Sequence, residues 1–295
     1  MPTQPDAPET AEVDPPVVRR DRAQEPGRWG LLPNRWRWRL APSQGREIAF
    51  LTAGFITLAW IRSGLGSRAP ADCGAAPELG ALRRSACERA LDIWHFERAL
   101  GTGFELSVGK ATGRAEPLAH LANHWYALAP VIATAAVLAW IYLRHPAQYR
   151  GLRTALVSAT AVALLGYLLY PMAPPRMLTQ AGFVDTGTAF PSWGYAALSS
   201  RSNQFAVMPA LQIAWTAWAA TAVVALSSKR WLRLVAVIVP VLTALASIAT
   251  ANHFWVNAVA GLVALWAGFL LQRLLSGQSA IDRTLSAAEP SATAP

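Results

Sequence analysis

Six runs of apolar residues alternate with polar segments along this chain. They fall at residues 48–65, 121–143, 152–170, 205–226, 234–250 and 254–271. A transmembrane helix needs about 17–25 largely apolar residues, and each run reaches that length. The first run is the weakest, because Arg62 interrupts it. The pattern predicts an all-α fold, a polytopic membrane bundle of about six transmembrane helices.

The segments outside these runs differ in character from the membrane region. Residues 1–45 are rich in proline, arginine and acids and have no apolar periodicity, so we expect a disordered cytoplasmic segment. No apolar core follows the first methionine, and no signal peptide is expected. Residues 67–116 carry mixed charge, with an amphipathic helix expected around residues 86–100. A six-span membrane domain is predicted over 46–275, followed by a disordered tail over 276–295.

The composition favours a membrane protein over a nucleic-acid-binding one. Hydrophobic residues make up 53% of the chain and charged residues 15%, against about a quarter charged in soluble domains. Asp185 is the only carboxylate between Glu116 and Asp282. The net charge of +9 comes mostly from arginines that flank the apolar runs, where they set topology and meet anionic headgroups. Membrane lipids are therefore the expected partners, and nucleic acid is not.

Basic residues in two loops predict how the chain is oriented. The loops at 144–153 and 229–233 contain basic residues and no acid, so both are expected on the cytoplasmic side. With six spans, both termini are then cytoplasmic, and the segments 171–204 and 251–253 face outside. We expect a multi-pass protein of the plasma membrane whose site lies on the extracytoplasmic face.

The two cysteines, Cys73 and Cys87, lie in one predicted outer region. They can form a disulfide in an oxidising compartment, or they can remain free thiols. The sequence leaves both possibilities open.

Three polar clusters are predicted to meet on the outer side of the membrane. They are residues 170–176 (Tyr-Pro-Met-Ala-Pro-Pro-Arg), 203–212 (Asn-Gln-Phe-Ala-Val-Met-Pro-Ala-Leu-Gln) and 250–257 (Thr-Ala-Asn-His-Phe-Trp-Val-Asn). The prolines restrict the backbone just before Arg176, whose planar guanidinium can clamp a phosphate with two parallel hydrogen bonds. Arg176 can equally be an interfacial residue that reaches the headgroups.

His253 lies beside Asn252 in the turn between the last two runs. A histidine in such a place is more often structural than functional. Asn257 follows four residues later on the same helical face, so it can hold the imidazole in one tautomer.

These motifs resemble the type-2 phosphatidic acid phosphatase superfamily, and more closely its inositolphosphotransferase-like branch, which includes inositol phosphorylceramide synthases. That branch reads approximately Tyr-Pro-x-x-Pro-Pro-Arg, then Ala-Met-Pro-Ser-Leu-His, then Thr-Gly-Asn-His-x-x-x-Asp. The resemblance covers roughly residues 48–272. Further matches are Ala90, Glu97, Leu100, Gly101, Glu105 and the segment Gly-Phe-Val-Asp-Thr at 182–186.

The resemblance implies a phosphate chemistry in which a histidine attacks phosphorus. In that family an aspartate orients the nucleophile, a second histidine protonates the leaving oxygen, and arginine and serine hold the phosphate. By this resemblance Arg176 is the phosphate clamp and His253 the nucleophile. The other three positions depart from the pattern: Ala210 stands in place of the serine, Gln212 of the proton donor and Asn257 of the aspartate.

The three departures are expected to impair catalysis. Gln212 cannot act as a general acid, a role that contributes about 10²–10⁴ in rate. Asn257 can accept a hydrogen bond from the imidazole but cannot neutralise an imidazolium, and Ala210 removes one donor to phosphate. His120 and His124 can in principle supply a proton, although polar interface roles fit them better.

Three functions remain in view, none needing a cofactor or a metal. The first is a catalytically impaired protein that binds a lipid phosphate or diphosphate through Arg176, Asn252 and His253. The second is an altered phosphatase or phosphotransferase that acts on isoprenoid diphosphates or other lipid phosphates through a His253 phospho-enzyme. The third is a non-catalytic structural or partner protein. A transporter fits less well, because the spans lack paired intramembrane charges.

Overall fold

The computed structural model describes residues 72–74, 80–190 and 204–281, and the regular elements in these ranges are all helices. The first predicted span (48–65), the predicted N-terminal segment and most of the predicted C-terminal tail lie outside the described residues. The all-α membrane architecture is confirmed for the part of the chain that is described.

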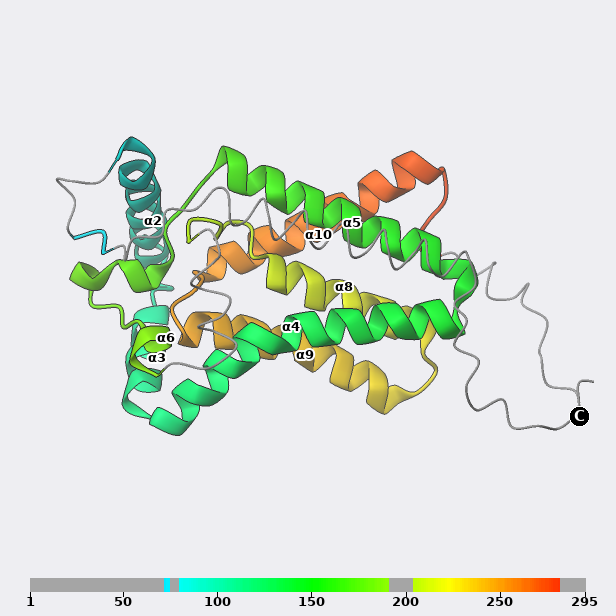
Figure 1. Cartoon of the computed structure of the whole chain (residues 1–295), viewed down its shortest axis with the longest axis horizontal. Helices are drawn as coiled ribbons and strands as arrows, with labels where there is room; N and C mark the ends of the chain where they lie inside the picture. The colour runs from blue at the N-terminus through cyan, green and yellow to red at the C-terminus, as the bar shows by residue number, and fades with distance from the viewer. Residues whose placement is uncertain (1–71, 75–79, 191–203, 282–295) are drawn as a thin grey trace, which may run out of the picture. The chain divides into compact units, whose positions relative to one another are not determined.

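Five helices correspond to the last five apolar runs (Figure 1). They are α4 (Glu116–Arg144), α5 (Pro146–Leu169), α8 (Leu211–Leu226), α9 (Arg230–Ala249) and α10 (Trp255–Ser276). All except α8 are long and apolar enough to cross a membrane, and α8 is a shorter apolar helix.

Helix α8 begins six residues later than the apolar run that predicted it. Residues 204–210 are not helical, and the helix starts at Leu211. Pro209 explains the difference, since proline lacks a backbone N–H and disfavours the helical conformation of the residue before it. The segment before α8 therefore has no regular secondary structure. Its side chains lie at the end of the bundle and can contribute to a site there.

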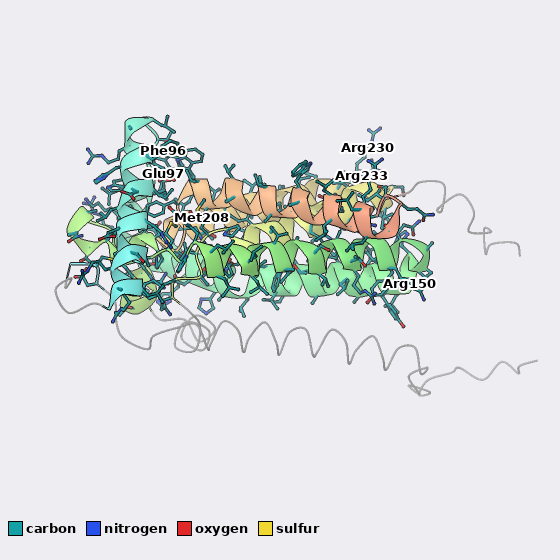
Figure 2. The ribbon with its side chains drawn as sticks, turned by 90° about the horizontal axis from the view of Figure 1, so that it is seen from above. Phe96, Glu97, Arg150, Met208, Arg230 and Arg233 are labelled. Carbon is teal, nitrogen blue, oxygen red and sulfur yellow. A yellow bond between two sulfur atoms is a disulfide. The ribbon has the colours of Figure 1, made fainter. Side chains whose placement is uncertain are left out.

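Five further helical elements of the described residues lie beyond the end of the bundle at which α10 begins (Figure 1). Helix α2 (Ala81–Ala99) confirms the amphipathic helix expected around residues 86–100, with its buried face formed by Ala86, Ala90, Trp94 and Glu97. It runs across the bundle end in both views (Figures 1 and 2). The others are α3 (Glu105–Arg114), η2 (Pro175–Met177), η3 (Thr179–Ala181) and α6 (Thr186–Ala189).

Small residues let α10 pack closely on its neighbours. A methyl group added at Gly268 would lie 2.6 Å from the backbone nitrogen of Ala159 in α5. One added at Gly261 would lie 2.5 Å from the carbonyl oxygen of Ala210. Both distances are too short for a real contact, so only glycine fits. Close helix approach through small residues is typical of membrane bundles, where lipid gives helices no hydrophobic drive to associate.

The outer surfaces of the long helices are apolar. On α9 the exposed large side chains include Leu234, Val237, Val241 and Leu245. A soluble protein seldom exposes apolar residues in a continuous stripe along a helix. The stripe therefore suits contact with lipid acyl chains and agrees with a multi-pass membrane protein.

Charged side chains lie at both ends of the bundle. Arg150, Arg230 and Arg233 gather at one end, whereas Glu97 of α2 lies at the other (Figure 2). A disulfide joins Cys73 to Cys87 of α2, which resolves the alternative that the sequence left open.

We expect Gly268→Ala to destabilise the protein, because the added methyl group would have to push α5 and α10 apart. Overpacking of this kind costs about 1–3 kcal/mol. The measurement is the melting temperature of the protein in detergent. Gly109→Ala in α3 is the matched control, since a methyl group there meets nothing within 4 Å. Equal melting temperatures for the two variants would contradict the packing described.

We also expect protein purified without reductant to contain no free thiol. Denatured protein treated with a maleimide reagent should be labelled twice after reduction and not at all before it, as counted by mass spectrometry. Labelling of the unreduced protein would show that Cys73 and Cys87 are not joined by a disulfide.

Candidate functional site

The turn between α9 and α10 carries the candidate histidine. The backbone N–H groups of Asn252 and His253 both donate to the carbonyl oxygen of Ser247, at 2.9 and 3.3 Å. Ala251 adopts a left-handed conformation with φ of 51°, which reverses the chain direction. The side chains of Asn252 and His253 are buried. The turn therefore presents two polar side chains to the interior of this bundle end.

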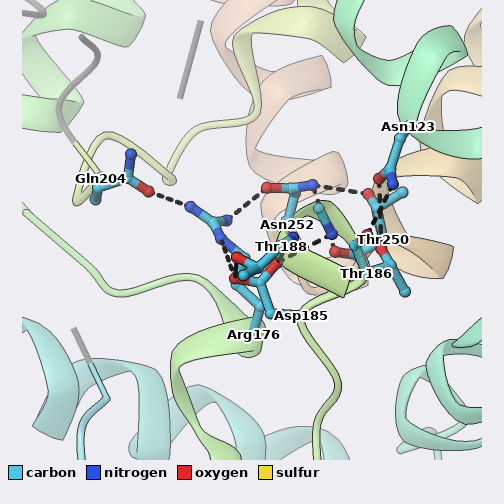
Figure 3. A network of polar contacts seen from close by, with 9 residues as sticks. Asn123, Arg176, Asp185, Thr186, Thr188, Gln204, Thr250 and Asn252 are labelled. Atoms are coloured by element: carbon cyan, nitrogen blue, oxygen red, sulfur yellow. Dashed lines mark hydrogen bonds and ion pairs between the residues drawn. The ribbon is translucent and has the colours of Figure 1, made fainter. Parts of the chain in front are cut away.

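Arg176 is held against that turn by its backbone and its side chain. Its N–H donates to the carbonyl oxygen of Ala251 at 2.9 Å. Its guanidinium donates to Asn252 Oδ1 and to Gln204 Oε1, and its Nε lies 4.0 Å from Asp185 Oδ2 (Figure 3). Only 10% of the side chain is exposed. Arg176 is thus a largely buried cation in a polar network and does not extend toward the headgroups.

Asp185 and Asn123 form the next layer of this network. Asp185 caps α6, accepting hydrogen bonds from the N–H groups of Gly187 and Thr188 and from the Thr188 hydroxyl. Asn123 of α4 donates to the carbonyl oxygens of Thr186 and Phe190 at 3.0 Å each. These bonds fasten the segment that carries Asp185 to the end of α4 (Figure 3).

Tyr126 links Gln212 to the histidine, a role that our reading of the sequence missed. Gln212 Nε2 donates to Tyr126 Oη at 3.0 Å, and Tyr126 Oη lies 3.4 Å from His253 Nε2. The sequence holds one indication of this role, because Tyr126 lies near the same end of α4 as His120 and His124. His124 is exposed and bonds the backbone of His120, whose ring lies 3.7 Å from Glu116. The tyrosine therefore occupies the place considered for the histidines.

Ala210 and Asn257 meet at the first turn of α10. The N–H of Ala210 donates to the carbonyl oxygen of Asn257 at 3.0 Å, and both residues are fully buried. The amide Oδ1 and Nδ2 of Asn257 are buried without a hydrogen-bond partner among the described residues. The hydrogen bond from Asn257 that was expected to orient His253 is therefore not formed.

The groups around Arg176 suit an anion better than they suit proton transfer. It combines one cation with neutral amide and hydroxyl groups, and Asp185 is its only carboxylate. In the described part of the chain, no group of three histidine, cysteine, aspartate or glutamate side chains could hold a metal ion.

Comparison with known families agrees with this architecture. A family model described as PAP2 superfamily matches residues 91–271, which is more than half of the chain. Comparisons with curated proteins and with solved structures gave no match. The matched region begins in α2 and ends in α10, so it includes Arg176, Gln212 and His253. The chain therefore belongs to the PAP2 superfamily, a family of membrane lipid phosphatase-like proteins.

Proposed function

We propose that this protein binds a lipid phosphate or diphosphate on the extracytoplasmic side of the membrane and that its hydrolytic activity is impaired. The observation that carries the proposal is the buried guanidinium of Arg176, shared between the amide oxygens of Asn252 and Gln204 next to His253. Amide oxygens are neutral acceptors. A phosphate oxygen forms a stronger, charge-assisted bond with the same N–H groups, so an incoming phosphate can replace them.

The charge around Arg176 supports an anion as the missing partner. A largely buried cation is costly unless it is paired. Asp185 approaches Nε at 4.0 Å, and its oxygens also accept three hydrogen bonds within α6. A phosphate beside the guanidinium would supply the charge that this distant carboxylate supplies only in part.

Three positions support impaired catalysis. Gln212 has no proton to transfer, and its Nε2 is engaged with Tyr126. The side chain of Asn257 makes no hydrogen bond to another described residue, and a neutral amide cannot neutralise an imidazolium at His253. Ala210 brings no hydroxyl to a phosphate oxygen. Binding and attack would therefore be separated, with the clamp kept and the proton-transfer groups missing.

Two features support the extracytoplasmic placement. The basic residues Arg150, Arg230 and Arg233 lie at the opposite bundle end, as expected for the cytoplasmic side (Figure 2). The disulfide between Cys73 and Cys87 belongs to α2, at the end that carries the site. Disulfides persist in oxidising compartments, outside the cytoplasm. The two features are independent and favour the same orientation of a protein in the plasma membrane.

A second candidate function is cleavage or transfer of a lipid diphosphate, and the position of Tyr126 favours it. His253 Nε2 would attack the terminal phosphorus, and the bond to the bridging oxygen would break, releasing the lipid monophosphate. Water or an acceptor hydroxyl would then take the phosphoryl group from the histidine. The Tyr126 hydroxyl lies 3.4 Å from His253 Nε2 and carries a proton that it could give to the leaving oxygen.

We expect purified protein in detergent to bind short-chain phosphatidic acid and a short-chain isoprenoid diphosphate, but not phosphatidylcholine of equal chain length. Arg176→Ala should weaken binding about 10–100-fold, because charge-assisted hydrogen bonds contribute about 1.5–3 kcal/mol each. Isothermal titration calorimetry measures the affinities. Arg84→Ala, an exposed arginine of α2, is the matched control and should bind like the parent protein.

The outcomes separate the candidate functions. Binding that needs Arg176, without release of phosphate, supports the proposal. Phosphate release from the diphosphate that is lost in both His253→Ala and Tyr126→Phe favours the enzyme. A protein that neither binds nor cleaves these lipids has a structural or partner role, and the proposal is then wrong.

We expect the triple variant Ala210→Ser, Gln212→His, Asn257→Asp to gain phosphatase activity toward phosphatidic acid. It restores a phosphate donor, a general acid worth about 10²–10⁴ in rate and, at position 257, a carboxylate in place of the amide. Phosphate release is measured against the same triple variant carrying His253→Ala, which should be inactive. A triple variant that folds with an unchanged melting temperature and binds lipid phosphate, yet stays inert, would refute the roles given to these three positions.

A further inference from the structure

Two fully buried glutamates meet the first turn of α10, directly after the histidine turn. Glu97 of α2 is 0% exposed, and its Oε1 accepts the N–H of Val256 at 3.1 Å. Glu105, the first residue of α3, is 1% exposed, and its Oε1 accepts the N–H of Trp255 at 3.2 Å. The first N–H groups of a helix lack intrahelical partners and carry partial positive charge. The two glutamates therefore cap α10 from outside the bundle.

The connection between α2 and α3 adds a third contact to the same turn. The Thr102 hydroxyl donates to the carbonyl oxygen of Glu97 at 3.0 Å and accepts the indole N–H of Trp255 at 3.0 Å. Gly101 turns the chain with φ of +73°, a conformation that favours glycine. The hairpin formed by α2 and α3, residues 81–114, thus forms three hydrogen bonds with the start of α10, two with backbone N–H groups and one with an indole N–H.

The two glutamates cannot both be charged without cost. The pKa of Glu97 is raised to about 8, and burial is the largest cause. The hydrogen bond from the Val256 N–H lowers the pKa in part, and the neighbouring Glu105 raises it. Each Oε2 is also buried, with no hydrogen-bond partner among the described residues. A proton on Glu97 removes the repulsion between neighbouring carboxylates, so the cap is stable as a pair that holds one proton.

Among the described residues, no cation forms an ion pair with either glutamate. Arg98 lies over the ring of Trp94, and Lys110 approaches Gly182. Helix α10 has no ionisable side chain before Arg273, and α9 has none after its first turn. The state of the pair therefore depends on its own proton.

We propose that Glu97 and Glu105 are positioning residues, a one-proton carboxyl pair that clamps the first turn of α10 and thereby holds His253 and Asn252 in place for an anion. The effect on anion binding rests on the proposed function, whereas the contact of the two glutamates with α10 does not. Phe254, which precedes the clamped residues, is fully buried against Phe183 and transmits the constraint to the turn.

The pH dependence has a defined sign. The pKa of Glu97 is raised from 4.5 to about 8 in the folded protein. Protonated Glu97 therefore stabilises the folded state fully below pH 4.5, and this contribution is lost as the pH rises through 8. Above pH 8 a second buried negative charge forces the carboxylates apart and frees the N–H groups of Trp255 and Val256. The affinity for an anion then falls as the population of clamped protein falls.

We expect the affinity for short-chain phosphatidic acid, measured by calorimetry at pH 7.5 and pH 9, to fall about tenfold in the parent protein. At one pH unit above the midpoint, about a tenth of the molecules keep the proton. The phosphate has lost its second proton throughout this range, so its own titration does not contribute. Glu97→Gln should show equal affinities at both pH values, because an amide keeps the acceptor and cannot ionise.

Two further variants test the coupling within the pair. Glu105→Gln should move the midpoint of the affinity profile to lower pH, because it removes the charge that raises the pKa of Glu97. Glu88→Gln, on the exposed face of α2, should leave the parent profile unchanged. A parent-like profile in Glu97→Gln, or a flattened one in Glu88→Gln, would overturn the proposal.

Hydrogen exchange of the Trp255 and Val256 amides tests the clamp without any ligand. After correction for intrinsic rates, protection should fall above pH 8 in the parent protein and stay constant in Glu97→Gln. If no lipid phosphate binds at any pH, the proposed function fails while this measurement still supports or refutes the clamp. Protection that is independent of pH in the parent protein would refute it.

Discussion

Arg176 and the α9–α10 turn hold each other in place through one backbone hydrogen bond and one side-chain hydrogen bond. The backbone bond, from Arg176 N–H to the carbonyl oxygen of Ala251, joins the 3-10 helix η2 to the reversal of the chain before α10. The side-chain bond to Asn252 buries the cation at the same point. Every other feature of the site is arranged around this junction: the amide of Gln204 completes the fork, and His253 follows Asn252 directly.

The membrane explains why charged groups lie at the ends of the bundle. Within a bilayer, a polar group must find its partner inside the protein. The long helices meet this demand with hydroxyls that bond the preceding turn, such as Thr160 to Leu156, and with small residues such as Gly268 at the contacts. Charged side chains lie at the two ends of the bundle: arginines such as Arg150 and Arg230 at one end, and the network around Arg176 at the end that α2, α3 and α6 cover (Figure 2). The long helices thus provide the apolar surface that suits lipid, and the segments at the bundle end carry the polar groups of the candidate site.

The spans that are described, the amphipathic helix and the family could be predicted from the sequence, because each rests on local pattern or on short motifs. Contacts between distant elements could not. The pairing of Tyr126 with Gln212 depends on the rotation of α4 against α8, which apolar periodicity does not determine. The late start of α8 depended on Pro209, whose effect an apolar run conceals.

The candidate site shows the same limit. The motifs named Arg176, Asn252 and His253, and the structure brings the first two into contact. The sequence also suggested a bond from Asn257 to the histidine, because the two share a helical face. His253 in fact precedes the first residue of α10, so the four-residue spacing does not make them neighbours on one helix. Motif spacing predicts side-chain geometry only where both residues belong to the same regular element.

Asp185 has two attachments, one to the guanidinium of Arg176 and one to the backbone of α6. A phosphate that displaces this carboxylate from the arginine would not strand it, because Gly187 and Thr188 would still donate to it. Asn123 would likewise keep the α6 segment fastened to α4. Under the proposed function, the exchange of an internal anion for an external one would therefore be a local event, and a lipid phosphate would enter and leave while the surrounding loops stay folded.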